Sequence, residues 1–338
     1  AAAQAAGARI VERARVTRVL IEGGRTVGVE ARMLRLDPAT GEALADAAGD
    51  PLEPATRRLV VRAPQVVVAA GALRTPAVLL ASGLDHPAIG RHLRIHPVPV
   101  VAGIFDEPID MWRGTMQAAR SLEFAAADGG RNGYAIESAP GHPGLIALAL
   151  PWEGTDPHAE LLGRIRHVAP LIAITKDGGE GRVRVTKAGR VRIDYALDET
   201  GVATLRHALG TMAELARSAG ARQIVAVGTP PLWHGRRRYL PGEEERAFVV
   251  YRDALASFDF APNRGKVFSA HQMGTVRMGA ANDHPTDPQG RVRSASGGLI
   301  AGLYVGDGSL FPTGLGVNPM ITIMALARRV ARTVSSER

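Results

Sequence analysis

Cysteine is absent from all 338 residues, which excludes disulfide bonds, thiolate nucleophiles and zinc–thiolate sites. No apolar run reaches the roughly 20 residues that a membrane-spanning helix needs. The first residues lack a basic segment followed by an apolar one, so we predict no signal peptide. These absences are compatible with a protein of the cytoplasm or of the membrane periphery. Lysine is nearly absent too, and its positions are Lys176, Lys187 and Lys266.

The charge balance raises the question of nucleic-acid binding, because the formal net charge is +8. The arginines are scattered, however, and the densest run, at 236–238, is short. A solvated basic surface is therefore the better explanation, and we predict no nucleic-acid partner. A composition of 46% hydrophobic and 22% charged residues is ordinary for a globular protein of one to three domains.

The N-terminal third predicts part of an α/β unit. Residues 9–35 suggest a β-hairpin or a meander, with Gly23-Gly24 supplying the positive φ of a tight turn. The continuous apolar run at 66–71 is typical of a strand buried on both faces. We expect Thr75-Pro76 to open a helix, where the missing N–H of proline does no harm, and Gly83 to end it. The polar stretch at 37–56 is predicted to be a loop.

The middle of the chain predicts a different architecture. Leu205, Leu209 and Met212 recur at helical spacing, so we expect a helix over 203–218, and a second over 243–258. Strands and helices in this order favour an antiparallel sheet with helices on one face. We therefore expect three segments, 1–97, 98–262 and 263–338. The predicted strands lie at 98–104, 134–138, 145–150, 171–175, 183–186 and 191–195.

Two late motifs each set one hydrogen-bonding side chain among small and apolar residues. Residues 269–279 read Ser-Ala-His-Gln-Met-Gly-Thr-Val-Arg-Met-Gly and contain His271, and residues 316–324 read Gly-Val-Asn-Pro-Met-Ile-Thr-Ile-Met and contain Asn318. A neutral imidazole can accept a hydroxyl proton near physiological pH. A lone histidine is more often structural, and an asparagine before a helix is often only its N-cap. The residues alone leave both interpretations open.

A third motif points to a family. Residues 71–83 read Gly-Ala-Leu-Arg-Thr-Pro-Ala-Val-Leu-Leu-Ala-Ser-Gly. With the two late motifs it resembles the glucose–methanol–choline (GMC) family of flavin oxidoreductases, except that Asp85 stands where the family has glycine. The likeness runs from about residue 9 to 334. It implies an α/β fold in which part of a Rossmann-like FAD-binding domain precedes an antiparallel-sheet substrate domain. The N-terminal ADP-binding unit with its Gly-x-Gly-x-x-Gly turn is expected to be missing.

The resemblance also implies a cofactor and a site. The cofactor is FAD, and no metal is expected, because no His, Asp and Glu cluster has ligand spacing. His271 would be the general base and Asn318 would bind the substrate oxygen, while the helix that follows Asn318 would direct its positive end at the flavin. Asp307 matches an acidic residue near the sugar-phosphate part of the flavin, and His92 and His96 are expected to be structural. The implied cofactor-binding residues are Val16, Ala70, Gly71, Gly306, Asp307, Asn318, Pro319 and Met320.

Three segments resemble the long-chain alcohol oxidase and dehydrogenase branch, at 90–97, 112–117 and 268–274. That branch implies oxidation of a primary aliphatic alcohol to an aldehyde. The electron acceptor stays open between oxygen, a quinone and another carrier. Two alternatives also stay open: a lyase of the same fold that retains FAD, and a non-catalytic fragment without the FAD phosphate site. Candidate residues for an apolar substrate pocket are Met116, Leu145, Ile146 and Leu148.

Overall fold

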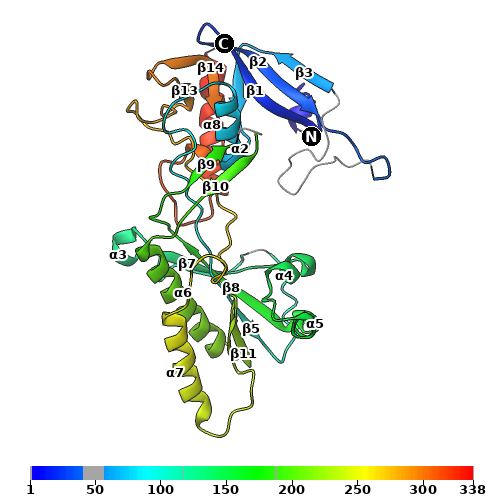
Figure 1. Ribbon diagram of the computed structural model, residues 1–338, viewed down its shortest axis with the longest axis vertical. Coiled ribbons are helices and arrows are strands. Elements are labelled where there is room, and N and C mark those ends of the chain that lie inside the picture. The colour runs from blue at the N-terminus through cyan, green and yellow to red at the C-terminus, as the bar shows by residue number, and fades with distance from the viewer. Residues whose placement is uncertain (1, 41–56, 116, 187–188, 338) are drawn as a thin grey trace.

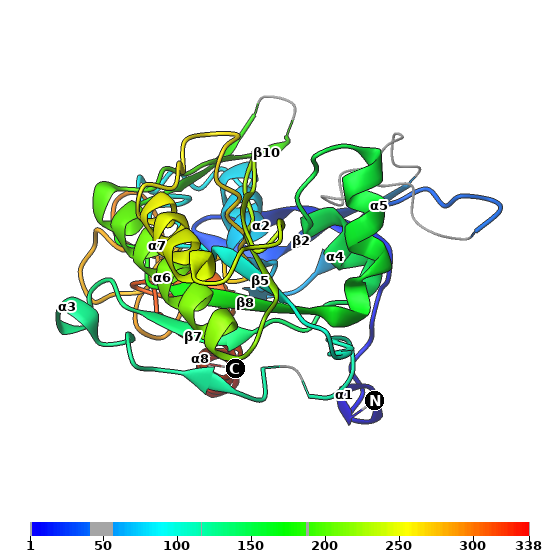
Figure 2. The same ribbon diagram turned by 90° about the horizontal axis from the view of Figure 1, so that it is seen from below.

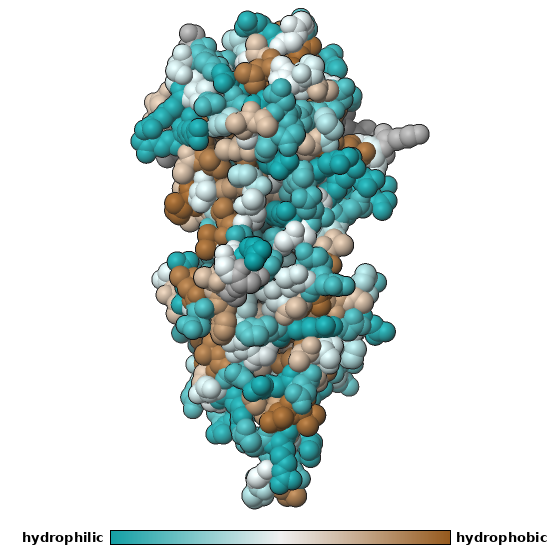
Figure 3. Space-filling model, turned by 90° about the vertical axis from the view of Figure 1, so that its left-hand side faces the viewer, coloured by the Kyte–Doolittle hydropathy of each residue, from teal (hydrophilic) through white to brown (hydrophobic). Residues whose placement is uncertain are grey.

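Within residues 2–40, 57–115, 117–186 and 189–337, which the computed structural model describes, the strands form two six-stranded sheets and a two-stranded one. The two large sheets occupy opposite halves of an elongated molecule (Figure 1). A space-filling view shows these halves joined by a narrower middle, with apolar residues scattered in small groups over that face (Figure 3).

The first sheet joins the two ends of the chain. Its order is β1-β2-β14-β13, with β3 paired to β2 and β4 paired in parallel to β14. The predicted hairpin is confirmed, with φ of +56° at Gly23 and +73° at Gly24. Most of the predicted loop, residues 41–56, lies outside the described residues. The strands are β1 (Ala14–Glu22), β2 (Arg25–Met33), β3 (Arg57–Arg62), β4 (Val66–Val68), β13 (Arg291–Arg293) and β14 (Leu299–Val305).

The strand expected at 66–71 is shorter and less buried than its composition suggests. β4 has three residues, and Val68 packs in the core with Leu79 and Leu303. Val67 lies on the opposite face and is 44% exposed. The prediction of burial on both faces is therefore wrong for Val67, because an apolar run does not report whether a neighbouring element covers each face.

The helix after β4 begins earlier than predicted. α2 spans Gly71–Ala81, so Pro76 lies inside it, and the expectation that Pro76 opens the helix is wrong. Proline has no N–H for the carbonyl four residues before it, here that of Ala72. Thr275 Oγ1 instead donates to Ala72 O at 2.6 Å, from a segment 203 residues away. The helix ends before Gly83, whose φ of +81° fits its predicted role as a stop.

The second sheet is antiparallel throughout, in the order β12-β11-β5-β8-β7-β6. α6 (Glu199–Ser218) and α7 (Glu243–Ala256) lie side by side against it (Figure 2). Leu209 and Met212 of α6 are buried there with Val101 and Ala226 of the sheet, which confirms the predicted layer. The strands are β5 (Val100–Ile104), β6 (Arg120–Ser121), β7 (Tyr134–Ser138), β8 (Val168–Thr175), β11 (Gln223–Ala226) and β12 (Leu232–His234).

Residues 145–150 form no strand, contrary to the prediction. Residues 145–149 belong to α4 (Pro143–Ala149) and Leu150 is its C-cap residue. The helix has proline in its first turn, and the His142 ring accepts the Gly144 N–H as a cap. Leucine and alanine fill the segment and favour a helix. Leu150 and Leu161 cover the second face of the sheet, and Leu161 lies on α5 (Thr155–Gly163). Smaller helices are α1 (Ala2–Ala5), α3 (Ala127–Gly130), η1 (Ile165–His167) and η2 (Gly308–Leu310).

The remaining elements connect the halves. The hairpin of β9 (Arg182–Val185) and β10 (Val191–Asp194) contacts α2, although its residues belong to the middle segment of the sequence. The last helix, α8 (Met320–Ser336), begins one residue later than predicted and contacts β14. None of the described helices has the length and apolar character needed to cross a membrane.

Candidate active site

The first part of the site lies where the parallel strands β4 and β14 end. Small residues follow both strands, with exposed Ala69 and Ala70 before Gly71 on one side and Gly306 on the other. The Gly306 N–H donates to Val68 O at 3.0 Å and holds the two ends together. Ligands of α/β sheets bind outside the carboxyl ends of parallel strands, and small residues allow a close approach there.

The Asp307 carboxylate accepts hydrogen bonds from residues on both sides of this edge. Its Oδ2 accepts from the Gly71 N–H at 2.9 Å and from Thr75 Oγ1 at 2.5 Å. Its Oδ1 accepts from the Ser309 N–H at 2.8 Å and the Ser309 hydroxyl at 2.6 Å. A carboxylate offers about four acceptor positions, and the protein occupies this number. Asp307 therefore ties the start of α2 to the end of β14, and a cofactor hydroxyl would have to displace one of these bonds.

The second part of the site is the start of α8. Pro319 is the N-cap residue and no side chain caps the helix, so the N–H groups of the first turn have no side-chain acceptor. The positive end of the helix dipole lies at this same first turn of α8. Val317 is 38% exposed, Met320 61% and Ile321 68%. This turn can receive a partly anionic, partly apolar group.

Asn318 is not the simple N-cap that its position before a helix suggests. Its Nδ2 donates to Oε2 of Glu137 at 3.2 Å, which leaves its second N–H as a donor and Oδ1 as an acceptor for another group. Glu137 lies on β7 and is 2% exposed. It links the second sheet to the start of α8. Nothing in the sequence around Glu137 singles it out.

His271 contacts a second histidine. Its Nδ1 lies 3.3 Å from Nδ1 of His96, and the two rings meet edge to face at 85°. His96 is fully buried, and its Nε2 accepts from the Leu315 N–H at 3.0 Å and the Gly316 N–H at 2.9 Å. His96 thus connects His271 to the loop that leads into Asn318.

Both rings are kept neutral at physiological pH. Burial, followed by the repulsion that a protonated His271 and Lys176 would exert, lowers the pKa of His96 to about 3. Burial also lowers the pKa of His271 below its ordinary value. An uncharged imidazole pair therefore faces the site.

The backbone around His96 is held from both sides. Asp177 Oδ2 accepts the Ile95 N–H at 2.9 Å, and its Oδ1 accepts the His96 N–H at 3.3 Å. Tyr195 donates its hydroxyl to Asp177 at 2.9 Å, and Ser269 donates to Ile95 O at 2.5 Å. His96 also has a φ of +49°, a conformation uncommon for residues other than glycine. The expectation that His96 is only structural overlooked its contact with His271, because no local pattern announces that contact.

The predicted residues fall into three places. Val16 lies on β1 and is 39% exposed. Ala70, Gly71, Gly306 and Asp307 lie at the ends of β4 and β14, and Asn318, Pro319 and Met320 lie at the start of α8.

Of the suggested pocket residues, Met116 lies outside the described residues, while Leu145 is 68% and Leu148 82% exposed. Ile146 packs against the cluster on the second face of the sheet.

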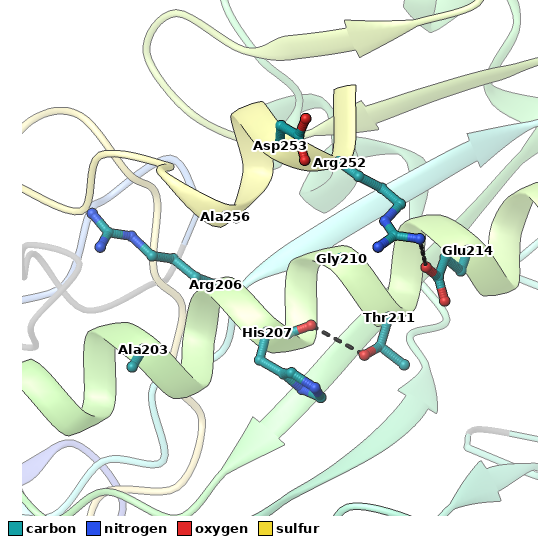
Figure 4. Close-up of a pocket in the computed structure, with 9 residues that line it drawn as sticks. All are labelled: Ala203, Arg206, His207, Gly210, Thr211, Glu214, Arg252, Asp253 and Ala256. Atoms are coloured by element: carbon teal, nitrogen blue, oxygen red, sulfur yellow. Dashed lines mark hydrogen bonds and ion pairs between the residues drawn. The ribbon is translucent and has the colours of Figure 1, made fainter. Parts of the chain in front are cut away.

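A groove elsewhere has no part in this site. It lies between α6 and α7 and has a volume of about 470 Å³ (Figure 4). Arg252 pairs with Glu214 across it at 2.6 Å, and Thr211 Oγ1 bonds to the His207 carbonyl at 3.1 Å. It contains none of the residues discussed above.

Comparison with known proteins decides the family. Two GMC oxidoreductase family models match the chain, at residues 1–98 and 178–327. The chain belongs to the GMC oxidoreductase family. It is 36% identical over 334 residues to an uncharacterised GMC-type oxidoreductase of Mycobacterium tuberculosis, covering 97% of this chain and 45% of that relative. It is 30% identical over 280 residues to a long-chain-alcohol oxidase of Arabidopsis thaliana, covering 79% of this chain and 36% of the relative.

The fold agrees with solved structures. A pyridoxine 4-oxidase from Mesorbium loti matches with a TM-score of 0.60 at 22% identity, covering 96% of this chain and 57% of that one. A formate oxidase of Aspergillus oryzae matches with a TM-score of 0.58 at 15% identity, covering 97% and 61%. The chain spans about half the length of the curated relatives that it matches most fully, 45% in the Mycobacterium case.

FAD is the cofactor of this family. The residues of this GMC chain fit such a group. A Cβ placed on Gly71 would meet open space, and Ala69 and Ala70 leave the end of β4 exposed. The uncapped first turn of α8 supplies N–H donors beside apolar side chains, as a flat ring with an anionic edge requires.

Proposed function

We propose that this chain forms the active-site half of an FAD-dependent oxidoreductase that converts a primary, long-chain aliphatic alcohol to an aldehyde. Residues 1–97 and 263–338 would make its part of the cofactor-binding domain, and 98–262 the substrate domain. The observation that carries the proposal is the contact of half-buried His271 with buried His96, which in turn bonds to the loop that leads into Asn318. The 30% identity to a long-chain-alcohol oxidase supports the substrate class.

The chemistry assigns a task to each part of the site. Alcohol oxidation removes a hydride from carbon and a proton from the hydroxyl, and bound FAD supplies the acceptor for the hydride. By the family resemblance, His271 would accept the hydroxyl proton as the general base, and Asn318 would bind the substrate oxygen. Ala70, Gly71 and Gly306 would allow the backbone to approach the cofactor closely. The first turn of α8 would stabilise negative charge on it through its N–H groups.

The test uses the full-length protein, purified with its flavin and kept free of oxygen. Dodecanol and hexadecanol are expected to bleach the flavin absorbance, and ethanol is expected to do so far more slowly. Cleavage of a cyanohydrin without bleaching would support a lyase instead. A full-length protein that binds flavin but is bleached by none of these alcohols would refute the proposed substrate class.

A non-catalytic role for the chain by itself is the second candidate. The observation in its favour is the partial coverage, 45% of the Mycobacterium relative, together with the lack of a Gly-x-Gly-x-x-Gly turn in the sequence. In that case the alcohol chemistry would require residues that this sequence does not contain.

A further inference from the structure

We propose that Glu137 is a positioning residue that fixes the side-chain amide of Asn318. Its carboxylate holds Nδ2, and not Oδ1, of that amide toward the second sheet. One N–H of Asn318 then donates to Glu137, and the other is left for a group bound in the site. Only the nature of that group, the oxygen of an alcohol, rests on the proposed function.

The first observation is the face of the sheet on which Glu137 lies. The neighbouring Ile136 packs in the core with residues of α6 and α7, and successive side chains of a strand point to opposite faces. Glu137 therefore points away from these two helices. On that other face Asn318 Nδ2 donates to its Oε2 at 3.2 Å, and the residue is 2% exposed. The hydrogen bond is thus made in the interior, between the second sheet and the start of α8.

The second observation is the kind of partner that this buried acid has. Buried carboxylates are usually paired with a cation, because burying a charge without a partner is costly. Arg120 is the residue opposite Glu137 on β6, but it is exposed. Within the described part of the chain, no arginine, lysine or histidine forms an ion pair with Glu137. The burial of this acid is therefore explained by its bond to the Asn318 amide and not by an ion pair.

The hydrogen bond determines the orientation of the amide. A carboxylate only accepts hydrogen bonds. If the amide were turned over, Oδ1 of Asn318 would lie against Oε2 of Glu137, and two acceptors with no proton between them repel each other. The amide atom that faces Glu137 must therefore be Nδ2. A side-chain amide has two donors on that nitrogen, so one N–H remains for another partner.

The fixed amide belongs to the same site as the two histidines. The N–H groups of residues 315 and 316, which lead into Asn318, donate to His96, and His96 contacts His271. In the proposed reaction His271 takes the hydroxyl proton, and the second N–H of Asn318 donates to the oxygen that loses it. Negative charge develops on this oxygen, so a donor that is already in place lowers the barrier. Glu137 does not contact the substrate oxygen and acts through Asn318.

The first test detects the Asn318 amide by NMR, without flavin, substrate or turnover. The chain of residues 1–338 is labelled with ¹⁵N in its asparagine side chains, and an Asn318→Ala variant identifies the Asn318 signals. We expect one of the two Asn318 N–H protons to be protected from exchange with water. Glu137→Gln should retain this protection, and Glu137→Leu should lose it. Two freely exchanging protons in the wild type, or unchanged protection in Glu137→Leu, would overturn the proposal.

The second test measures flavin reduction by dodecanol in the full-length enzyme, purified with FAD and kept free of oxygen. Glu137→Leu removes the acceptor and should slow reduction by roughly 10- to 100-fold, the scale of a misplaced group in an active site. Glu137→Gln retains an oxygen acceptor at the same reach and should recover most of the rate. In an Asn318→Ala background, Glu137→Leu should cost less than about twofold, because no amide is left to orient.

Each other outcome of the second test has a definite meaning. A Glu137→Gln enzyme as slow as Glu137→Leu would show that the charge matters and not the hydrogen bond, and would overturn the proposal. So would an equal cost of Glu137→Leu with and without the Asn318 amide, since a residue that only fills the core behaves in this way. If Glu137→Leu does not bind flavin, Glu137→Asp replaces it, because the shorter side chain withdraws the acceptor from Asn318, and the same loss is expected.

The two tests also separate this proposal from the proposed function. A full-length protein whose flavin no alcohol bleaches would refute the function. The exchange of the Asn318 amide protons would still decide the role of Glu137.

Discussion

Thr275→Val is expected to destabilise the chain through a helix that it does not belong to. Thr275 and Ala72 are both buried, and the Thr275 hydroxyl is the donor that Ala72 O receives in place of an N–H at Pro76. Valine has nearly the same shape but no hydroxyl, so it leaves a buried carbonyl without its donor. Such a loss costs about 1–3 kcal/mol of unfolding free energy.

Pro76→Ala provides the matched control. Alanine restores the N–H four residues after Ala72, and a carbonyl oxygen can accept two hydrogen bonds. The single variant is expected to change stability by less than about 1 kcal/mol, the usual scale of a proline's effect on the unfolded chain. In the Pro76→Ala background, Thr275→Val should cost about 1 kcal/mol less than in the wild type.

Urea unfolding followed by circular dichroism measures all four proteins of this cycle, which isolates the coupling between the two sites. Equal costs of Thr275→Val in both backgrounds would refute the argument. The hydrogen bond from Thr275 to Ala72 O would then not compensate for the N–H that Pro76 lacks. The cycle needs neither cofactor nor substrate, so its result does not depend on the proposed function.

Three other results are expected. In the full-length enzyme, His271→Ala should lower the rate of flavin reduction by about 100-fold or more, the usual cost of losing a general base. His271→Gln, which fills a similar space but cannot take up the hydroxyl proton, should lose about as much, and recovery of most of the rate in His271→Gln would contradict a base. The chain of residues 1–338 should bind FAD weakly, and a purified protein with stoichiometric yellow flavin would contradict this. Because burial lowers the pKa of His96 to about 3, the unfolded chain binds the extra proton first. The stability contributed by a neutral His96 is therefore complete above about pH 6.5 and is lost as the pH falls toward 3, the folded-state value. His96→Asn should flatten that part of the wild-type pH profile in urea titrations, and identical profiles would contradict it.

Local features of the sequence predicted much of the architecture. Gly23 and Gly24 indicated the first hairpin, Gly83 indicated the end of α2, and the spacing of Leu205, Leu209 and Met212 indicated the long helix α6. These signals depend on the backbone freedom of glycine and on one-sided burial, both of which a short stretch of sequence records. The GMC motifs added the family, which the comparisons confirmed.

Other features depended on residues far apart in the chain. Pro76 looked like a helix start because the rule for proline is local, but a hydroxyl 203 residues away makes an interior proline acceptable. Residues 145–150 were predicted to be a strand because the periodicity of a short apolar segment does not distinguish a strand from a helix. Glu137 carried no signal at all until the fold set it against Asn318.

The sequence alone determined that this chain contains the histidine, the asparagine and the small residues that the proposed function requires, because these are chemical identities. The tertiary structure decided which residues contact them. His96 lies 175 residues from His271, and the two amides that it accepts lie 219 and 220 residues from it. The hydrogen-bond partners of a buried imidazole set its orientation, and partners so far apart in the sequence are known only when the chain has folded.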